Sequence, residues 1–244
     1  SARLDAMVRV TAQLITVGGR KTTLKTRFVT GGQQLLRTDE EATGPLDDAV
    51  AQALLDRALA ALEGCDALVL SDYGKGVLGP MVTSALIAAA NNAEKPVIVD
   101  PKGRDYTRYR GASLLTPNRN ELAQASGMTL DNDAAVVAAC TKIIDDCGVR
   151  AVLATLGSRG MTLVRDGIAD HLAARARAVF DVSGAGDTVA AAMAAGLALG
   201  VPALRAARLA NIAAGVAVAK TGTAAAHGDE ILSALHEAEF LTGE

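Results

Sequence analysis

The stretch that decides the fold is "DVSGAGDTVAAAMAAGLALG", residues 181–200. Its second half is rich in Ala, Leu and Met, which favour an α-helix with faces small enough for close packing. Before that helix, Gly184, Ala185 and Gly186 leave the backbone N–H groups of the helix N-terminus almost bare, which favours the binding of an anion. Yet Asp187, itself an anion, lies in the same turn, and a chemical reason for this arrangement has to be found.

A Gly-x-Gly-Asp turn alone leaves two interpretations open, because Asp and Gly are also ordinary residues at the start of a helix. The neighbouring pattern is more informative. Short apolar strands are expected at residues 66–72, 96–100, 113–118, 151–157 and 160–167, and helices at residues 46–62, 80–91, 118–126, 131–147, 185–199, 202–219 and 228–240. Strands that alternate with helices predict an α/β fold with a mainly parallel sheet covered by helices on both faces.

Polar or glycine-rich segments follow four of these strands directly. They read "LSDYGKG", "DPKG", "TPNRNE" and "TLGSRG" and begin at residues 70, 100, 116 and 155. Because ligands bind beyond the carboxyl ends of the strands in parallel sheets, these segments are expected to surround a single cleft. The helix that begins near Gly184 would face the same cleft, which favours the anion-site interpretation.

Composition narrows the class of protein. The chain has 244 residues, of which 50% are hydrophobic and only 2% aromatic, so a large core of small and aliphatic side chains is expected. A net charge of −3 without a basic block argues against nucleic acid or an anionic membrane as the main partner. No apolar run reaches the length of a membrane span, and the cysteines and histidines follow no metal-ligand spacing. We therefore expect a soluble cytoplasmic protein with reduced thiols.

Residues 1–44 depart from the alternating pattern. β-Branched residues are frequent in "VRVTAQLITV" and "TTLKTRFVT", and "QQLLRTDEE" follows Gly31 and Gly32. This segment predicts a small, mostly β lid with at least one hairpin that turns at residues 30–32. The expected division is a lid or dimerisation hairpin at residues 1–44 and an α/β core at residues 45–244. An isolated hairpin is marginally stable in water, so pairing of two lids in a homodimer is expected.

Together, these motifs are similar to those of a known family. "DVSGAGDT" resembles the signature of the ribokinase-like, or PfkB, sugar kinases, "TPNRNE" resembles their Asn-x-x-Glu motif, and "TLGSRG" resembles their nucleotide-side glycine loop. "LSDYGKGVL", "VDPKGRDYTRYRGASLLTPNRNE" and "KTRFVTGGQQLLR" are most similar to the kinases of D-glycero-β-D-manno-heptose 7-phosphate. The resemblance covers nearly the whole chain. It implies ATP-dependent phosphorylation of the anomeric hydroxyl to a 1,7-bisphosphate, a step toward ADP-heptose for the lipopolysaccharide core.

The resemblance gives the glycine turn its chemistry. An aspartate is ordinarily ionised at neutral pH, and Asp187 would take the proton of the sugar hydroxyl. The N–H groups of Gly184, Ala185 and Gly186 would hold the charge that develops on the γ-phosphoryl group. A carboxylate beside the phosphate is then expected, because the nucleophile passes between them while metal ions and the helix dipole offset the repulsion.

Further residues are implied on the nucleotide side. Glu121 would hold Mg²⁺ through water, and Asn118, on the same helical turn, would face the same phosphates. The other candidates for binding ATP are Lys102, Arg119, Asn120, Thr155, Gly157, Gly160 and Asn211. Asn211 would flank adenine, with a buried structural asparagine as an equal alternative. Backbone oxygens of Asp181 and Ser183 would bind a monovalent cation such as K⁺, as in many members of the family.

The candidates for the sugar phosphate come from one loop and from the hairpin: Asp72, Lys75, Arg27, Gln34 and Arg37. Charged donors suit a phosphate, and arginine can bind it with two hydrogen bonds. Polar residues that alternate along a strand normally face water, so exposure to solvent is the competing interpretation for the hairpin residues.

Several alternatives stay open. Members of the family begin with a strand carrying Gly-Asp and with a Gly-Gly-Asn segment, and Gly18–Gly19 lacks the following Asn, so the amino-terminal part of the family fold is expected to be missing. Other PfkB-type kinases, of fructose, ribose or nucleosides, would share the ATP side. An inactive nucleotide-binding or assembly module is a further alternative, against which the retained Asp187 argues. A dinucleotide-dependent oxidoreductase is disfavoured because no Gly-x-Gly-x-x-Gly follows an early strand.

Overall fold

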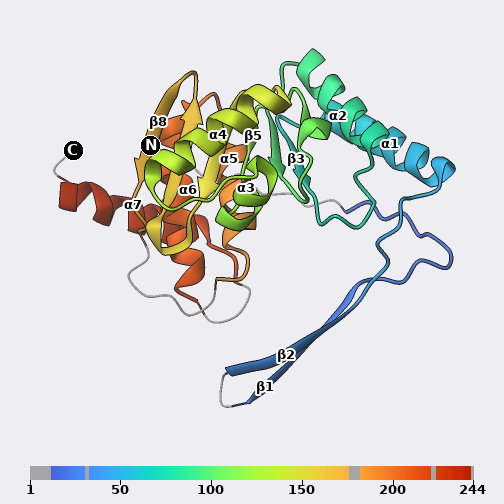
Figure 1. Cartoon of the computed structure of the whole chain (residues 1–244), viewed down its shortest axis with the longest axis horizontal. Coiled ribbons are helices and arrows are strands. Elements are labelled where there is room, and N and C mark those ends of the chain that lie inside the picture. Colours follow the sequence, from blue (N-terminus) through green and yellow to red (C-terminus); the bar gives the residue numbers. More distant parts are fainter. Residues whose placement is uncertain (1–11, 31–32, 176–181, 221–223, 243–244) are drawn as a thin grey trace.

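The computed structural model describes residues 12–30, 33–175, 182–220 and 224–242. Within these ranges it contains a two-stranded sheet and a separate six-stranded sheet. Figure 1 shows the two-stranded sheet projecting from a main body in which helices surround the larger sheet. The α/β fold predicted from the sequence is confirmed.

The larger sheet is mixed and has the order β3-β4-β5-β6-β7-β8. Its parallel part consists of β3 (Leu68–Ser71), β4 (Val97–Asp100), β5 (Leu114–Leu115) and β6 (Ala151–Thr155). Strands β7 (Met161–Arg165) and β8 (Ile168–Leu172) extend it in antiparallel orientation. The carboxyl ends of β3 to β6 therefore meet at one edge of the sheet, where the polar segments were expected to gather.

Strand β8 is not among the strands expected from the sequence. It pairs with β7 across Asp166 and Gly167, whose φ angles are 49° and 72°. Two successive residues in the left-handed region form the two-residue hairpin turn whose twist matches that of the flanking strands, and Asp-Gly is one of its favoured sequences. The dipeptide was thus a usable signal for the missing strand.

The helices cover both faces of the sheet. Helices α1 (Asp48–Glu63), α2 (Pro80–Asn92), α3 (Arg119–Ser126) and α4 (Asp133–Cys147) pack against one face, and α5 (Ala185–Ala198) and α6 (Ala203–Val218) against the other. Helix α7 (Gly228–Thr242) packs on α6. The short 3₁₀ helices η1 (Thr107–Tyr109) and η2 (Gly157–Arg159) follow β4 and β6. No helix in the described part of the chain is long and apolar enough to span a bilayer.

The side chains of β4 illustrate how the core is divided. Val97 and Val99 belong to the cluster on the α1–α4 side, and Ile98 belongs to the cluster under α5 and α6. This alternation is required of a strand buried on both faces. On the second side, α5 and α6 approach closely, since a Cβ added to Gly196 would lie 2.8 Å from the Cβ of Ala206. The small residues within residues 185–198 therefore form the surface through which α5 packs against α6.

The expected hairpin is present as β1 (Leu24–Thr30) and β2 (Gln33–Glu40), which pair in antiparallel fashion with an irregularity between Phe28 and Val29. Its turn residues 31–32 lie outside the described residues, and every residue of β1 is exposed. Of the strand expected at residues 8–17, residues 12–17 have no regular structure and the others lie outside the description. The division at residue 44 stays a prediction.

Candidate active site

A cavity of about 780 Å³ lies beyond the carboxyl ends of the parallel strands. It is lined by the start of α3, the loop after β6, the segment after β8, the start of α5 and one side of α6: Asn118, Arg119, Asn120, Thr155, Leu156, Gly157, Ser158, Gly160, Met161, Ala174, Arg175, Val182, Ala185, Gly186, Val189, Asn211, Ala214, Gly215 and Val218. The structure thus brings together most of the predicted ATP-binding residues. Lys102 and Glu121 are not among the lining residues. The sequence analysis did not select Ala174 or Arg175, which follow the unexpected strand β8.

The tip of α5 is open to solvent. Gly184 caps the helix with φ 79° and ψ 0°, a conformation that favours glycine, and its carbonyl accepts the Thr188 hydroxyl at 2.8 Å. Gly186 and Asp187 are exposed, and a Cβ added to Gly186 would meet no atom of the described residues within 4 Å. The Ala185 N–H donates a long bond of 3.3 Å to the Val182 carbonyl, so an anion could replace this partner. A ligand in the cavity can therefore reach the helix N-terminus beside the Asp187 carboxylate.

The Asn-x-x-Glu motif forms a capping box. The Asn118 side-chain oxygen accepts the N–H groups of Asn120 and Glu121, each at 3.0 Å, and one Glu121 carboxylate oxygen accepts the Asn118 N–H at 3.0 Å. The other oxygen of Glu121 accepts the Lys102 ammonium at 2.8 Å. These contacts fix the start of α3 and tie it to the loop after β4. A role of Glu121 in binding the metal and a role of Asn118 in binding the phosphates stay predictions. Each residue would have to combine that role with capping the start of α3.

Asp100, which sequence reasoning missed, is an acidic residue close enough to Glu121 and Asp187 for their charges to act on it, although it does not line the 780 Å³ cavity. It ends β4 and is half-buried. Burial, together with the nearby charges of Glu121 and Asp187, raises its pKa to about 7, against the opposing charge of Lys102. The sequence signal for Asp100 is a carboxylate at the end of a buried strand, within the "DPKG" segment that is expected to border the cleft.

The donor set around Asp100 fits Mg²⁺. Carboxylate oxygens are its preferred protein ligands, and it usually keeps several waters while binding one or two carboxylates and the substrate phosphates. No group of three or more His, Cys, Asp or Glu side chains within the described ranges is arranged to hold an ion by itself. An ion held through water by Asp100 or Glu121 is compatible with this. For the monovalent cation, Ser183 is half-buried, whereas Asp181 lies outside the described residues.

Three of the predicted sugar-binding residues, Asp72, Lys75 and Arg37, have other partners. Asp72 is 6% exposed and fully engaged with protein donors, as described below. Lys75 forms an ion pair with Glu41 at the base of the hairpin. Arg27 lies opposite Arg37 in the hairpin, and Arg37 pairs with Asp39 at 2.9 Å. The side chain of Gln34 lies outside the description, and no described hairpin residue lines the 780 Å³ cavity.

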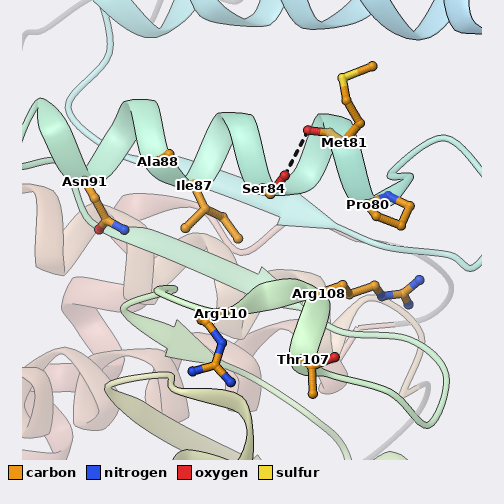
Figure 2. A pocket seen from close by; sticks show the side chains of 9 residues that line it. All are labelled: Pro80, Met81, Ser84, Ile87, Ala88, Asn91, Thr107, Arg108 and Arg110. Atoms are coloured by element: carbon orange, nitrogen blue, oxygen red, sulfur yellow. Dashed lines mark hydrogen bonds between the residues drawn. The ribbon is translucent and has the colours of Figure 1, made fainter.

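A second cavity of about 550 Å³ lies between α2 and the η1 segment. Figure 2 shows Arg108 and Arg110 from the η1 segment across from Ser84, Ile87 and Asn91 of α2. It shares no residue with the first cavity.

The fold and the cavity at the tip of α5 define a carbohydrate kinase. Residues 7–229 match the pfkB family carbohydrate kinases, and the chain belongs to this family. It is 55% identical over 227 residues to the bifunctional protein HldE of Paramagnetospirillum magneticum, covering 93% of this chain and 46% of that protein. It is 54% identical over 221 residues to the bifunctional protein HldE of Rhodospirillum rubrum, covering 90% and 45%. The chain thus spans about half the length of these curated relatives.

Solved structures support the fold assignment. Ribokinase from Giardia lamblia has a TM-score of 0.74 at 22% identity, covering 91% of this chain and 73% of that one. Phosphofructokinase-2 from Escherichia coli in complex with potassium also has a TM-score of 0.74, at 20% identity, covering 89% and 71%. At such identities the likeness concerns the fold alone.

The raised pKa of Asp100 predicts how stability depends on pH. The folded protein keeps this proton up to about pH 7, whereas a free aspartate loses it near pH 4, so the contribution to stability is lost as the pH rises between these values. Replacing Asp100 by Asn, which is always neutral, should raise the free energy of unfolding by roughly 1 kcal/mol or more at pH 8 and by less at pH 5. Urea unfolding in EDTA at both pH values measures this. Equal gains at the two pH values would contradict the assignment.

Proposed function

We propose that the protein transfers the γ-phosphoryl group of ATP to the anomeric hydroxyl of D-glycero-β-D-manno-heptose 7-phosphate. The product is the 1,7-bisphosphate, on the route to ADP-heptose for the lipopolysaccharide core. The observation that carries the kinase step is the open tip of α5, where the exposed Asp187 lies beside the first backbone N–H groups of the helix at the edge of a nucleotide-sized cavity. The choice of sugar rests on the "DYGKG" and "DPKG" motifs and on the similarity to the bifunctional HldE proteins.

The residues divide the mechanism between them. Asp187 accepts the proton of the anomeric hydroxyl as that oxygen attacks the γ-phosphorus, and the N–H groups of residues 184–186 stabilise the charge on the transferred group. A divalent ion, when bound, neutralises part of the phosphate charge, and Asp100 and Glu121 would hold it through water. Arg119 supplies a further positive charge at the cavity wall.

The base of the nucleotide fits between α6 and the loop after β6. Asn211 is 7% exposed, and its side-chain nitrogen donates to the Ala173 carbonyl at 2.7 Å, so it joins α6 to the segment after β8. This bond gives Asn211 a structural role in addition to the proposed contact with adenine. A K⁺ site formed by backbone oxygens of Asp181 and Ser183 is also proposed, in line with the potassium complex of phosphofructokinase-2.

We also propose that the protein forms a homodimer through its hairpin and that it is located in the cytoplasm. By its register, the hairpin places Leu24, Phe28 and Leu36 on one face, and all three are exposed. Pairing of two such faces in a homodimer would remove this apolar surface from water. Light scattering at micromolar concentration should give the mass of a dimer, and a monomer would contradict the pairing.

Cys65, Cys140 and Cys147 are free, as the thiols of a cytoplasmic protein would be.

The function is tested with a panel of acceptors given to the whole protein with Mg·ATP. Heptose 7-phosphate should be turned over with a higher kcat/KM than fructose 6-phosphate, ribose or nucleosides, and phosphorus NMR should locate the new phosphate on the anomeric carbon. A new phosphate on a primary hydroxyl, or a preference for another acceptor, would favour the alternative of another PfkB-type kinase.

A further inference from the structure

The carboxylate of Asp72, at the end of β3, is committed to other protein groups. One of its oxygens accepts the Gly74 N–H at 2.7 Å. The other accepts the Tyr109 hydroxyl at 2.7 Å and lies 3.0 Å from the Arg108 guanidinium. A carboxylate that is only 6% exposed requires such partners, because an unpaired buried charge is strongly destabilising. Asp72 is therefore poorly placed to bind a sugar directly.

The two partners of Asp72 from η1 also hold the backbone of Lys102. The Lys102 N–H donates to the Tyr109 hydroxyl oxygen at 3.2 Å, and the Arg108 guanidinium donates to the Lys102 carbonyl. Tyr109 is completely buried, and Arg108 lies over its ring with 4.8 Å between the guanidinium carbon and the ring centroid. The backbone adds a further link, since the Asp72 N–H donates to the Asp100 carbonyl at 3.0 Å.

The Lys102 side chain continues these contacts to the active site. A Cβ added to Gly74 would lie 3.3 Å from Lys102 Cγ, so the loop after β3 packs against the stem of the lysine. The lysine ammonium then pairs with Glu121 at 2.8 Å. A continuous set of contacts runs from Asp72 through the loop at residues 100–103 to the start of α3.

We infer that Asp72, Arg108 and Tyr109 form a clamp that positions the loop at residues 100–103, and with it Lys102 and Asp100, toward the phosphates of the bound nucleotide. The inference rests on the proposed function and assigns Asp72 a positioning role in place of the predicted sugar contact. The clamp residues touch no reacting atom. They act through Lys102, so their loss should alter nucleotide binding and turnover rather than affinity for the sugar.

A pair of tyrosines provides a matched test. Replacing Tyr109 by Phe removes the hydroxyl bonded to Asp72 and Lys102 but keeps the ring and leaves Asp72 paired with Arg108 and Gly74. The control is Tyr106→Phe, because Tyr106 is equally buried, its ring centroid is 5.7 Å from that of Tyr109, and its hydroxyl has no hydrogen-bond partner among the described residues. Both variants lose a tyrosine hydroxyl, but only the Tyr109 hydroxyl is bonded to the loop at residues 100–103.

The readouts are the affinity for a non-hydrolysable Mg·ATP analogue by calorimetry, kcat, and the KM values for both substrates. For Tyr109→Phe, we expect nucleotide affinity and kcat to fall by roughly three- to tenfold, the order expected when this hydroxyl loses its hydrogen bonds to Asp72 and Lys102, with the KM for the sugar unchanged. Tyr106→Phe should behave as the parent protein. Unchanged values for Tyr109→Phe, or a change confined to the KM for the sugar, would overturn the clamp. Nucleotide affinity is measured without sugar, so a wrong sugar assignment would not mimic this failure.

The 550 Å³ cavity allows a second test, because Arg108 lines it (Figure 2) and its removal would open the cavity toward Asp72. Turnover by Arg108→Ala should rise on addition of guanidinium below its denaturing concentration. Arg110→Ala is the control, since Arg110 lines the same cavity but donates to the Asp146 carbonyl at 3.3 Å, and guanidinium should not raise its rate. An Arg108→Ala rate that guanidinium does not raise would count against the clamp.

Discussion

Replacing Asp187 by Asn should lower kcat for phosphoryl transfer by about 10²–10⁴-fold, the usual effect of removing a general base. The amide has the shape of the carboxylate but cannot accept the proton of the sugar hydroxyl. Asp187 is exposed in the first turn of α5, so the fold should survive the change. Because the carboxylate repels the phosphates, binding of Mg·ATP should be equal or tighter in the variant. Release of ADP and calorimetric titration with the ATP analogue measure the two quantities separately.

The control is Asp145→Asn, which removes an exposed carboxylate from α4 and should change neither quantity. If Asp187→Asn and the parent protein turned over substrate at the same rate, the assignment of the base would be wrong. If both bound ATP without turning over any acceptor, the alternative of an inactive nucleotide-binding module would be favoured. A loss of rate accompanied by weaker ATP binding would instead indicate damage to the tip of α5.

Much of the fold followed from local patterns. Apolar runs such as "PVIVD" are strands buried on both faces, and the seven helices expected from periodicity are found with bounds that differ by no more than two residues. The glycine turn before Asp187 was informative for a different reason, because the motif combines a conformation and a chemical group within one turn. Most of the predicted nucleotide residues line the cavity because strand ends in such sheets converge.

The contacts that reach across the chain could not be predicted in this way. Asp72 and Tyr109 are far apart in the sequence, and no local pattern indicates that they share a hydrogen bond. The pKa of Asp100 depends on burial and on charges contributed by α3 and α5. Sequence patterns indicated neither the protein partners of Asp72 nor the position of Asp100 near the site, and both gaps have one cause; the sugar contact of Asp72 stays a prediction. A polar residue at a strand end can be assigned to the cleft from sequence, whereas its partners depend on packing.

The end of β8 lies so close to Gly160 that no side chain fits at this position. Replacing Gly160 by Ala should lower the free energy of unfolding by roughly 2–5 kcal/mol. Its φ of 88° and ψ of −131° are strained for any residue with a Cβ. An added Cβ would also lie 2.0 Å from the Leu172 carbonyl oxygen and 2.6 Å from the Ala174 nitrogen. Both are backbone atoms at the end of β8, so the strand end would have to move.

The displacement should also weaken ATP binding, because Ala174 and Arg175 line the cavity and the Ala173 carbonyl accepts the Asn211 side chain. Gly157→Ala is the matched control. Gly157 lies in the same loop with φ 62°, but an added Cβ meets nothing within 4 Å, so only the conformational cost of about 1–2 kcal/mol is expected. Urea unfolding compares the two variants, and titration with the ATP analogue tests Gly160→Ala. Equal losses of stability would mean that β8 does not cross the glycine loop as closely as described, and the cavity wall formed by residues 174–175 would have to be reconsidered.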